Sequence, residues 1–415
     1  MKPALLHRHL AVAIAAVKLL SPSMLSAQDT ADAQDPAEWR PTPEGLRRMA
    51  EYFPYEIVAR GQDVAELAPG EPIEGIDGLD LEGFNRNNLS TGMIVLHRGR
   101  VVYEGYWQGA DSGSRLMSWS LVKSITGTLI GIAEAEGLID SIADPVTRYV
   151  PELTATAYAG VTIEQALQMS SGVRWSAIDE GMRLTCLTLP PGPVFADCAT
   201  VRTRFGNLEE LIRSLDERAA EPGTTFAYSS IDTQVLAWVL KNATGRSPAE
   251  YLSEKLWQLL GMEDDAEWLL DEPGGQPLAG VAINARLRDY ARFGQLMLND
   301  GRSGERQILP AGWVERATTP GKPYLERLDP EVFGYQYQWW IVPEGLVVAN
   351  GSGAFEAQGA QGQFLHVDPE HELVIVLTSA WPEPTGWNVE RAMAFHTTVG
   401  SIIRALGYET GVPAE

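Results

Sequence analysis

The sequence predicts an α+β fold in which strands and helices occupy separate parts of the chain. Strand-forming residues gather near residue 93 and return after residue 335, so both ends of the chain contribute strands. The interval 156–279 carries mainly helical spacing of its apolar residues, with long loops. We therefore expect an antiparallel sheet flanked by helices, built from about 85–155 and 280–410, with an all-helical insertion over 156–279.

The first residues have the pattern of a secretory signal peptide. Lys2 and Arg8 precede an apolar run, AVAIAAVKLL, and small residues follow up to Ala27. The run is shorter than the roughly 20 apolar residues that a membrane-spanning helix needs. We therefore expect a signal peptide over 1–27, no membrane span after its removal, and a periplasmic or secreted protein.

Residues 28–45 are polar and contain proline, which predicts a flexible lead-in before a single folded unit over 46–415. The chain has 32 Lys and Arg against 55 Asp and Glu, a formal net charge of -23, and 45% hydrophobic residues. This composition is typical of a globular protein. The acidity argues against a nucleic-acid partner, which needs a basic face, and against docking on anionic lipid. A soluble enzyme or a binding protein remains.

The elements of the folded unit follow from periodicity and turn signals. Two β-rich runs, Met93–His97 and Val101–Trp107, are separated by Arg98-Gly99-Arg100 and predict a hairpin. Ser120–Glu136 has helical spacing, and Gly137 stands where glycine commonly ends a helix. Further helices are expected over Ile163–Met169, Leu208–Arg218, Thr233–Ala243, Pro248–Leu260, 285–300 and Trp387–Leu406. Further strands are expected over Tyr335–Val342, Leu346–Ala349, Gln363–Val367 and Leu373–Thr378.

The two cysteines, Cys186 and Cys198, lie 12 positions apart in a segment that contains proline and glycine. In an oxidising compartment they could close a small loop, and the alternative is a pair of free buried thiols. Neither has a neighbouring histidine, so we expect no zinc site there.

Several common catalytic motifs are missing. Beyond the predicted signal peptide, the chain has no His-x-His or His-Glu-x-x-His spacing for a metal, and no Gly-x-Ser-x-Gly nucleophile motif. It also has no Gly-x-Gly-x-x-Gly sequence and no P-loop. We therefore expect a site without metal, nucleotide or other cofactor, and without a Ser-His-Asp triad.

One motif that can carry chemistry is Ser-x-x-Lys, formed by Ser120 and Lys123 at the start of a predicted helix. Residues three apart share a helix face, so the lysine amine can reach the serine hydroxyl. A serine needs a base to become a good nucleophile, and a lysine removed from water can serve as that base. The helix N-terminus also offers N–H groups to a developing negative charge. A solvated lysine beside an N-terminal serine would give the same pattern.

Two further segments that could take part in catalysis follow the Ser-x-x-Lys motif along the chain. Tyr228 and Ser230 precede an apolar helix, and a tyrosine hydroxyl near a Ser/Lys pair can relay a proton to a leaving group. A half-buried aromatic beside a helix-capping serine is the alternative. The glycine-rich run 357–363 enters a strand and can bring a backbone N–H close to a ligand, although an ordinary turn has the same composition.

With these residues in view, the chain resembles the serine β-lactamase-like hydrolases over about 90–405. The resemblance rests on SWSLVKSITGTLIGIAEAEGLID, FAYSS and GAQGQFLHVDPEHELVIVL. The segments LRDYARFG and YQWW make it most similar to the 6-aminohexanoate-dimer hydrolase-like group. The resemblance implies a β-lactamase/transpeptidase-like fold and the cleavage of a small amide or ester through an acyl-enzyme.

The resemblance also implies roles for individual residues. Ser120 would be the acylated nucleophile, Lys123 its base and Tyr228 the proton relay, with Ser230 as a supporting residue of the Tyr-x-Ser motif. The backbone N–H groups of Ser120 and Ala360 would form the oxyanion hole.

This chain departs from the penicillin-recognising members of the superfamily, which carry Lys-Thr-Gly or His-Thr-Gly. Ala357-Gln358-Gly359 takes that place here, with Gly351-Ser352-Gly353 as a competing alignment. Without the cation, a β-lactam or D-Ala-D-Ala carboxylate loses a partner. A penicillin-recognising enzyme and a non-catalytic binding protein on the same fold remain the alternatives.

The amide-hydrolysing group also uses a tyrosine and an aspartate in the region that follows Met-Ser-Ser-Gly. This chain has Asp179 and Glu180 there but no tyrosine, which leaves ester hydrolysis open. The two acids are more typical of a solvated loop. The substrate pocket is expected to include aromatic side chains, although most aromatics belong to cores. The candidates are Trp119, Trp339, Trp340 and Phe355.

Overall fold

The computed structural model describes residues 42–76, 78–174, 207–328, 333–348, 351–382 and 388–411. The predicted signal peptide over 1–27 lies outside the described residues, as do Cys186, Cys198, Asp179 and Glu180.

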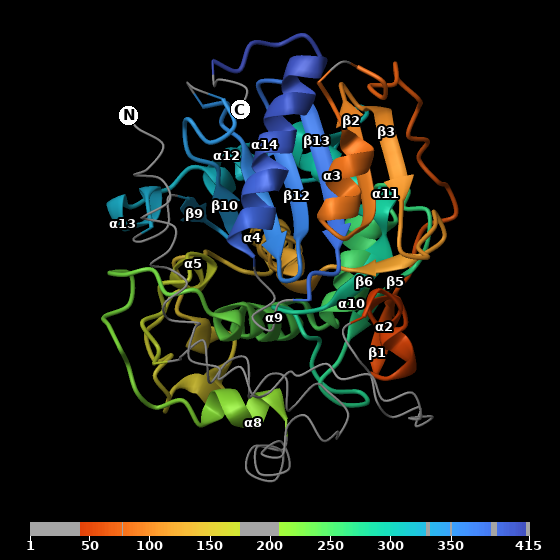
Figure 1. Cartoon of the computed structure of the whole chain (residues 1–415). Coiled ribbons are helices and arrows are strands. Elements are labelled where there is room, and N and C mark those ends of the chain that lie inside the picture. The colour runs from red at the N-terminus through yellow and green to blue at the C-terminus, as the bar shows by residue number, and fades with distance from the viewer. Residues whose placement is uncertain are drawn as a thin grey trace, which may run out of the picture.

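The main sheet has seven antiparallel strands in the order β3-β2-β13-β12-β11-β10-β9 (Figure 1). Strands β2 (Ser90–His97) and β3 (Arg100–Tyr106) form the predicted hairpin. The other five come from the C-terminal part of the chain, and β13 pairs directly with β2. These are β9 (Gly334–Gln336), β10 (Trp339–Ile341), β11 (Phe355–Gly359), β12 (Gln363–Asp368) and β13 (Leu373–Ser379). The prediction of an antiparallel sheet built from both ends is confirmed.

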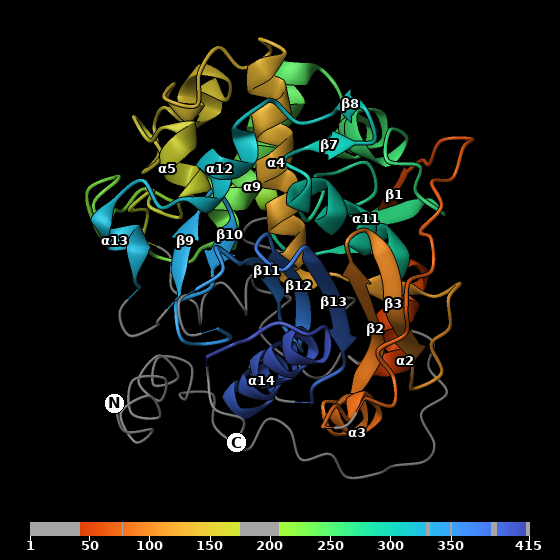
Figure 2. The ribbon, with the colours of Figure 1, turned by 90° about the horizontal axis from the view of Figure 1, so that it is seen from above.

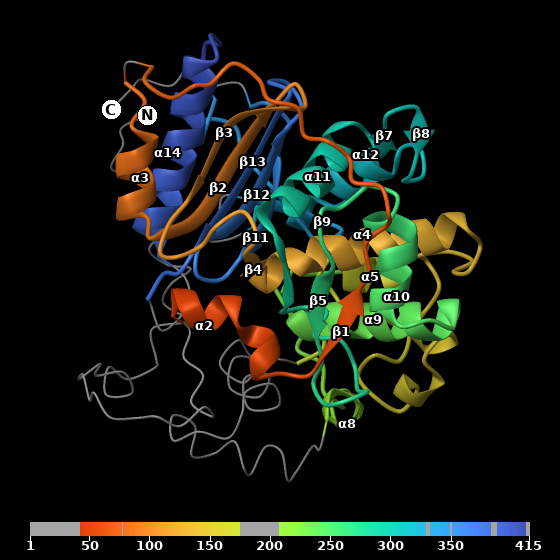
Figure 3. The same ribbon diagram turned by 90° about the vertical axis from the view of Figure 1, so that its right-hand side faces the viewer.

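Helices cover both faces of this sheet (Figure 3). On one face, α3 (Leu81–Asn87) and α14 (Val389–Ala405) pack against the outward side chains of the central strands. On the other face lies α11 (Leu287–Leu298), whose apolar side belongs to the larger core. Alternation of side chains along each strand divides the apolar residues between the two cores.

The helical part lies beside the sheet and is built around α4 and α9 (Figure 1). Helix α4 (Val122–Ala135) runs through the interior of the molecule (Figure 2), and its residues from Val122 to Ala133 are all buried. Helix α9 (Ser230–Thr244) begins where the Ser229 side chain caps it and ends at Gly245, which has a φ of 67°. Three shorter α-helices and one π-turn complete this part: α5 (Ile163–Leu167), α8 (Leu208–Arg213), α10 (Pro248–Leu252) and η8 (Ser253–Trp257).

The sequence predicted an all-helical insertion over 156–279. This prediction is wrong in one place, because the interval contains the strand β5 (Ala266–Leu269). This strand joins a second antiparallel sheet, in the order β1-β5-β6-β4, whose other members lie far away in the chain. They are β1 (Tyr55–Val58), β6 (Ile283–Arg286) and β4 (Arg115–Met117). A four-residue strand depends on its partners for stability, so local periodicity does not reveal it.

Two other expected elements differ in detail. The expected strand Tyr335–Val342 is divided into β9 and β10, because Tyr337 and Gln338 have positive φ angles of 33° and 72° and reverse the chain. Residues 346–348 form turns and bends, so the strand expected over Leu346–Ala349 is wrong for these positions.

The flexible lead-in expected over 28–45 overlaps the first helix of the described residues. Helix α2 (Pro43–Arg47) begins at Pro43, because Thr42 accepts a hydrogen bond from the Gly45 N–H at 3.1 Å and proline suits the first helical position. The remaining elements are short. They are α12 (Trp313–Thr318), α13 (Pro323–Glu326), η4 (Met49–Glu51), η5 (Trp119–Leu121), η6 (Val146–Arg148), η7 (Pro151–Leu153), β7 (Arg302–Ser303) and β8 (Arg306–Gln307). Among the helices of the described residues, none is both long and apolar enough to cross a membrane.

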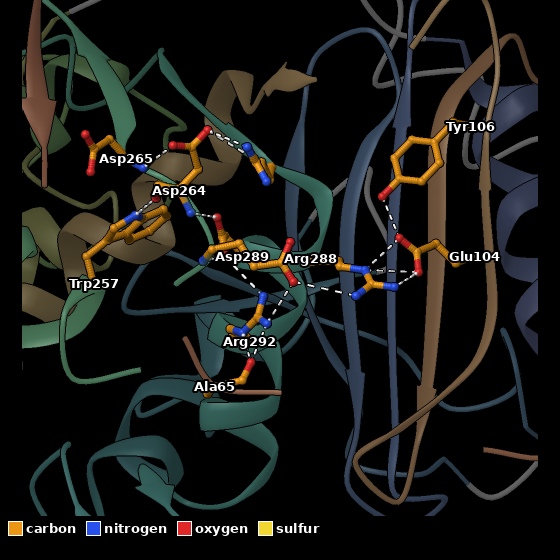
Figure 4. A network of polar contacts seen from close by, with 11 residues as sticks. Ala65, Glu104, Tyr106, Trp257, Asp264, Asp265, Arg288, Asp289 and Arg292 are labelled. Atoms are coloured by element: carbon orange, nitrogen blue, oxygen red, sulfur yellow. Dashed lines mark hydrogen bonds and ion pairs between the residues drawn. The ribbon is translucent and has the colours of Figure 1, made fainter. Parts of the chain in front are cut away.

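Ion pairs join α11 to β3 of the main sheet and to the loop before β5 (Figure 4). The Arg288 guanidinium donates to both carboxylate oxygens of Glu104 on β3, at 2.6 to 3.1 Å. One turn further along the helix, Arg292 pairs with Asp289 at 3.2 Å and with Glu263 at 3.0 Å. Burial raises the pKa of Asp289 to about 6, and Arg292 counteracts part of this rise. The network therefore places charged groups in the interior.

Candidate active site

The Ser-x-x-Lys motif lies where the η5 turn passes into α4. The Lys123 Nζ atom is 2.8 Å from the Ser120 Oγ atom and also donates to the backbone carbonyl of Gly280. Lys123 is 1% exposed, whereas Ser120 is half-buried and therefore reachable from solvent. The Ser120 hydroxyl also lies 3.5 Å from the Gly280 carbonyl oxygen. The solvated-lysine alternative is thus excluded for this motif.

Ser118 anchors the chain just before the nucleophile candidate. Its N–H donates to the Ile283 carbonyl at 2.9 Å, and its Oγ accepts from the Ile283 N–H at 3.0 Å. The next residue, Trp119, has a φ of 44°, a left-handed conformation that costs a non-glycine residue on the order of 1–3 kcal/mol. The bonds of Ser118 hold the chain directly before this strained position and therefore fix the start of the turn that carries Ser120.

Tyr228 ends the loop that enters α9 and lies beside the same lysine. The centre of its ring is 5.0 Å from Lys123 Nζ. Ser230 is buried in the first turn of α9 and packs on Gly280, where an added Cβ would lie 2.8 Å from the Ser230 carbonyl oxygen. The structure therefore brings Ser120, Lys123, Tyr228 and Ser230 together around Gly280. Sequence reasoning missed Gly280, because a lone glycine in a loop carries no motif.

The turn after β11 lies directly against the η5 turn. A Cβ at Gly359 would overlap the Ser118 carbonyl oxygen and lie 3.0 Å from the Trp119 Cβ, so glycine is needed for this approach. Ala360 follows at the half-buried edge of the same contact. The segment that carries Ala360 is thus in contact with the segment that carries Ser120.

Ala357-Gln358-Gly359, the segment expected to align with Lys-Thr-Gly, contains no lysine or histidine. Ala357 is fully buried, and the Gln358 side chain donates to a buried carboxylate, Glu356, at 2.7 Å. Burial alone would raise the pKa of Glu356, but His396 and His366 outweigh that effect and hold the pKa below its usual range. The second position of this segment is therefore committed to an internal hydrogen bond.

The four aromatic candidates for the pocket separate into two groups. Trp340 and Trp119 are half-buried, and the Trp340 ring stacks on Tyr228 with centroids 5.5 Å apart. Trp339 and Phe355 are 0% and 1% exposed and pack on each other in the core, with ring centroids 5.1 Å apart. The expectation that these two line the pocket is wrong. Neighbours on a strand face opposite sides, so only one of Trp339 and Trp340 could face the site.

Two further aromatics belong to the cluster at Tyr228. Phe226 and Tyr335 contact Trp340 with ring centroids 6.1 and 5.0 Å away, and Tyr335 also meets Tyr228 edge-on at 6.3 Å. Burial raises the pKa of Tyr335 well above its ordinary value, so this phenol stays neutral. The spacing of Phe226 and Tyr228, two residues apart in FAYSS, is the signal that could have linked them.

Known proteins are similar to this chain over most of its length. A family model described as Beta-lactamase matches residues 81–395 of the chain. The 6-aminohexanoate-dimer hydrolase of Paenarthrobacter ureafaciens is 32% identical over 366 residues, which cover 83% of this chain and 88% of that protein.

Solved structures lead to the same group. One from Bacillus anthracis, assigned as a 6-aminohexanoate-dimer hydrolase, has a TM-score of 0.76 at 26% identity and covers 91% of this chain and 99% of its own. A family VIII carboxylesterase has a TM-score of 0.57 at 16% identity, covering 78% of this chain and 96% of its own, and shows the shared fold alone.

The predicted resemblance and the predicted fold are both confirmed by these matches. The family model covers more than half of the chain, and the hydrolase from Paenarthrobacter ureafaciens exceeds 30% identity over most of its length. The chain therefore belongs to the Beta-lactamase family, within the superfamily of serine β-lactamases and transpeptidases, and is a serine hydrolase.

Proposed function

We propose that the protein hydrolyses small esters and amides through an acyl-enzyme on Ser120, with Lys123 as base and Tyr228 as proton relay. The observation that carries this proposal is the 2.8 Å distance between Lys123 Nζ and Ser120 Oγ, with the lysine buried and the serine half-buried. A base at hydrogen-bond distance is what a serine hydroxyl needs to attack a carbonyl carbon.

The steps follow from this arrangement. Ser120 Oγ attacks the carbonyl carbon, and its proton passes to Lys123 Nζ. The N–H groups of Ser120 and Ala360 receive the negative oxygen of the tetrahedral intermediate. As the bond to the leaving group breaks, Tyr228 gives that group a proton and regains one from Lys123. Water then attacks the acyl carbon, gives up a proton along the same path, and Ser120 leaves with its hydroxyl restored.

The substrate class is proposed from the relatives and from the site. The hydrolase from Paenarthrobacter ureafaciens is named for the 6-aminohexanoate dimer, an amide, and the fold is shared with a carboxylesterase. The half-buried aromatics Trp340 and Tyr228 offer an apolar wall to an acyl or alkyl chain. In the expected alignment, Ala357 stands where penicillin-recognising enzymes carry a lysine or histidine, and this buried methyl group offers a β-lactam carboxylate no partner.

The test compares three substrates. Purified protein is incubated with p-nitrophenyl butyrate, the 6-aminohexanoate dimer and nitrocefin, beside the Ser120→Ala variant. Turnover of the ester or the amide that is lost in Ser120→Ala is the expected result. Nitrocefin turnover at a rate that rivals the ester would contradict the inference from Ala357 and favour a penicillin-recognising enzyme. No turnover and no covalent mass shift with an acylating probe would favour a binding protein.

We also propose that the protein is exported to the periplasm or the medium, which the pattern of residues 1–27 supports. Mass spectrometry of the native protein from the producing cell is expected to find an N-terminal peptide that begins at Gln28. An intact Met1 in the cytoplasmic fraction would contradict export.

A further inference from the structure

Trp119, which the sequence predicted as a residue of the substrate pocket, makes a hydrogen bond through its indole N–H. Its indole Nε1 donates to the side-chain carbonyl of Gln361 at 2.9 Å. Trp119 is the residue directly before Ser120, and Gln361 is the residue directly after Ala360. One hydrogen bond therefore links the neighbours of the two backbone N–H groups that would form the oxyanion hole.

Gln361 is itself held from the other side. The side-chain Nε2 of Gln361 donates to the backbone carbonyl of Trp381 at 3.2 Å. The backbone carbonyl of Gln361 accepts from the backbone N–H of Trp381 at 3.3 Å. Trp381 is fully buried and donates from its indole to the Asn88 carbonyl at 3.0 Å. Gln361 thus connects the buried Trp381 to Trp119 through hydrogen bonds.

The turn that contains Gln361 has little freedom to move. Gln361 has a φ of 58°, and the next residue, Gly362, has a φ of 84° with its backbone against the Trp381 ring. The Gln363 amide donates to the carbonyls of Ala360 and Gln361, each at 3.1 Å, and to that of Ser379 at 2.8 Å. Both Trp119 and Gln361 adopt left-handed conformations that non-glycine residues rarely adopt, and such conformations persist only where neighbouring bonds impose them.

We infer that Gln361 is a positioning residue that holds the Ala360 N–H in register with the Ser120 N–H through its bond to Trp119. The inference rests on the proposed function, because it assigns a purpose to those two donors. Gln361 touches neither the Ser120 hydroxyl nor Lys123 by any contact described above. It acts through the geometry of the turn, so its loss affects the stabilisation of the transition state more than the binding of substrate.

The test is a double-mutant cycle with Gln361→Leu, Trp119→Phe and the double variant. Each single variant is expected to lower kcat for p-nitrophenyl butyrate about 10- to 100-fold, below the full effect of deleting an oxyanion donor. KM should stay within about twofold. Inhibition by phenylboronic acid, which places an oxygen in the oxyanion position when it adds to a serine, should weaken by the same factor as kcat/KM. The double variant should be no worse than the more affected single one, because both remove the same bond.

Three controls distinguish a positioning role of Gln361 from a loss of folded protein. Trp107 donates its indole N–H to Glu82 at 3.2 Å, so Trp107→Phe removes a bond of the same kind at another place and should leave kcat unchanged. The pH profile of kcat/KM should keep its shape in Gln361→Leu, because the proton-transfer residues are untouched. A mere loss of folded protein would lower the active fraction, measured by titration with an acylating probe, without weakening phenylboronic acid.

The outcomes distinguish this inference from the proposed function. If Ser120→Ala abolishes turnover but Gln361→Leu and Trp119→Phe keep kcat and boronic acid affinity within twofold, the positioning role is overturned and the proposed function stands. Losses that multiply in the double variant would also overturn it, since they would show independent effects. If Ser120→Ala retains full turnover, the proposed function fails first and the inference fails with it.

Discussion

Replacement of Arg292 by methionine tests how much the buried ion pairs of α11 contribute to stability. The Arg292 and Asp289 side chains are 4% and 1% exposed, and their closest atoms are 3.2 Å apart. Arg292 also pairs with Glu263 at 3.0 Å and donates from Nε to the Ala65 carbonyl at 3.1 Å. Methionine fills much of the same volume but leaves these acceptors without the guanidinium.

The magnitude follows from the burial of the pair. Removal of one partner from a buried ion pair costs about 3–5 kcal/mol, because the remaining charge is neither solvated nor paired. With an unfolding entropy of about 2.1 cal/mol/K per residue, a chain of this length loses roughly one degree of Tm for each 0.9 kcal/mol. Arg292→Met should therefore lower Tm by about 3–6 °C.

Thermal unfolding followed by circular dichroism measures the effect, with ester kcat at 25 °C as a check on the site. The matched control is Arg86→Met, because Arg86 pairs with Glu82 at 3.4 Å while the two side chains are 71% and 61% exposed. An exposed pair contributes at most about 1 kcal/mol, so this control should move Tm by no more than about 1 °C. If Arg292→Met lowers Tm no more than Arg86→Met does, the reasoning from burial is wrong.

Three further predictions concern catalysis and pH. Lys123→Met should lower kcat about 100- to 10,000-fold at every pH while ester binding persists; retention of more than a tenth of the activity would remove Lys123 as the base. Gly359→Ala should lower kcat about 10-fold or more, because the new Cβ pushes the β11 turn away from Ser118, whereas Gly113→Ala, which meets nothing closer than 3.5 Å, should not. Because burial raises the folded-state pKa of Asp289 to about 6, its contribution to stability is present below about pH 4 and is lost as pH rises through about 6. Tm measured across this window should fall less steeply in Asp289→Asn than in the wild type, and an unchanged slope would contradict the assignment.

Local sequence patterns were sufficient to predict those elements and site residues whose own residues show a strand, helix or motif spacing. The hairpin of β2 and β3 has two β-rich runs around a glycine turn, and strand signals near both ends of the chain predicted one sheet built from both. The Ser-x-x-Lys spacing placed Ser120 and Lys123 on one face of a helix, which the structure shows within 2.8 Å of each other.

The features that escaped prediction depend on contacts between distant segments. Strand β5 is stabilised by β1 and β6, and Gly280 receives Lys123 only because the loop before β6 folds onto α9. Two adjacent tryptophans, Trp339 and Trp340, look alike in the sequence, yet one enters the core and the other stacks on Tyr228. Their separation follows from the strand alternation once the register of β10 is known.

The pairing of β2 with β13 has a consequence for how the protein matures. Ser120 and Ala360 are 240 positions apart, and β2 pairs with β13, which is the last strand of the sheet in chain order. A growing chain therefore displays the apolar edge of β2 until almost all of it has emerged, and such contacts form late because long loops must close. The same arrangement means that no fragment ending before Ala360 holds both of the N–H groups proposed for the oxyanion hole. Hydrolytic activity is thus a readout of completed assembly, and truncated chains of this protein should be catalytically silent rather than partly active.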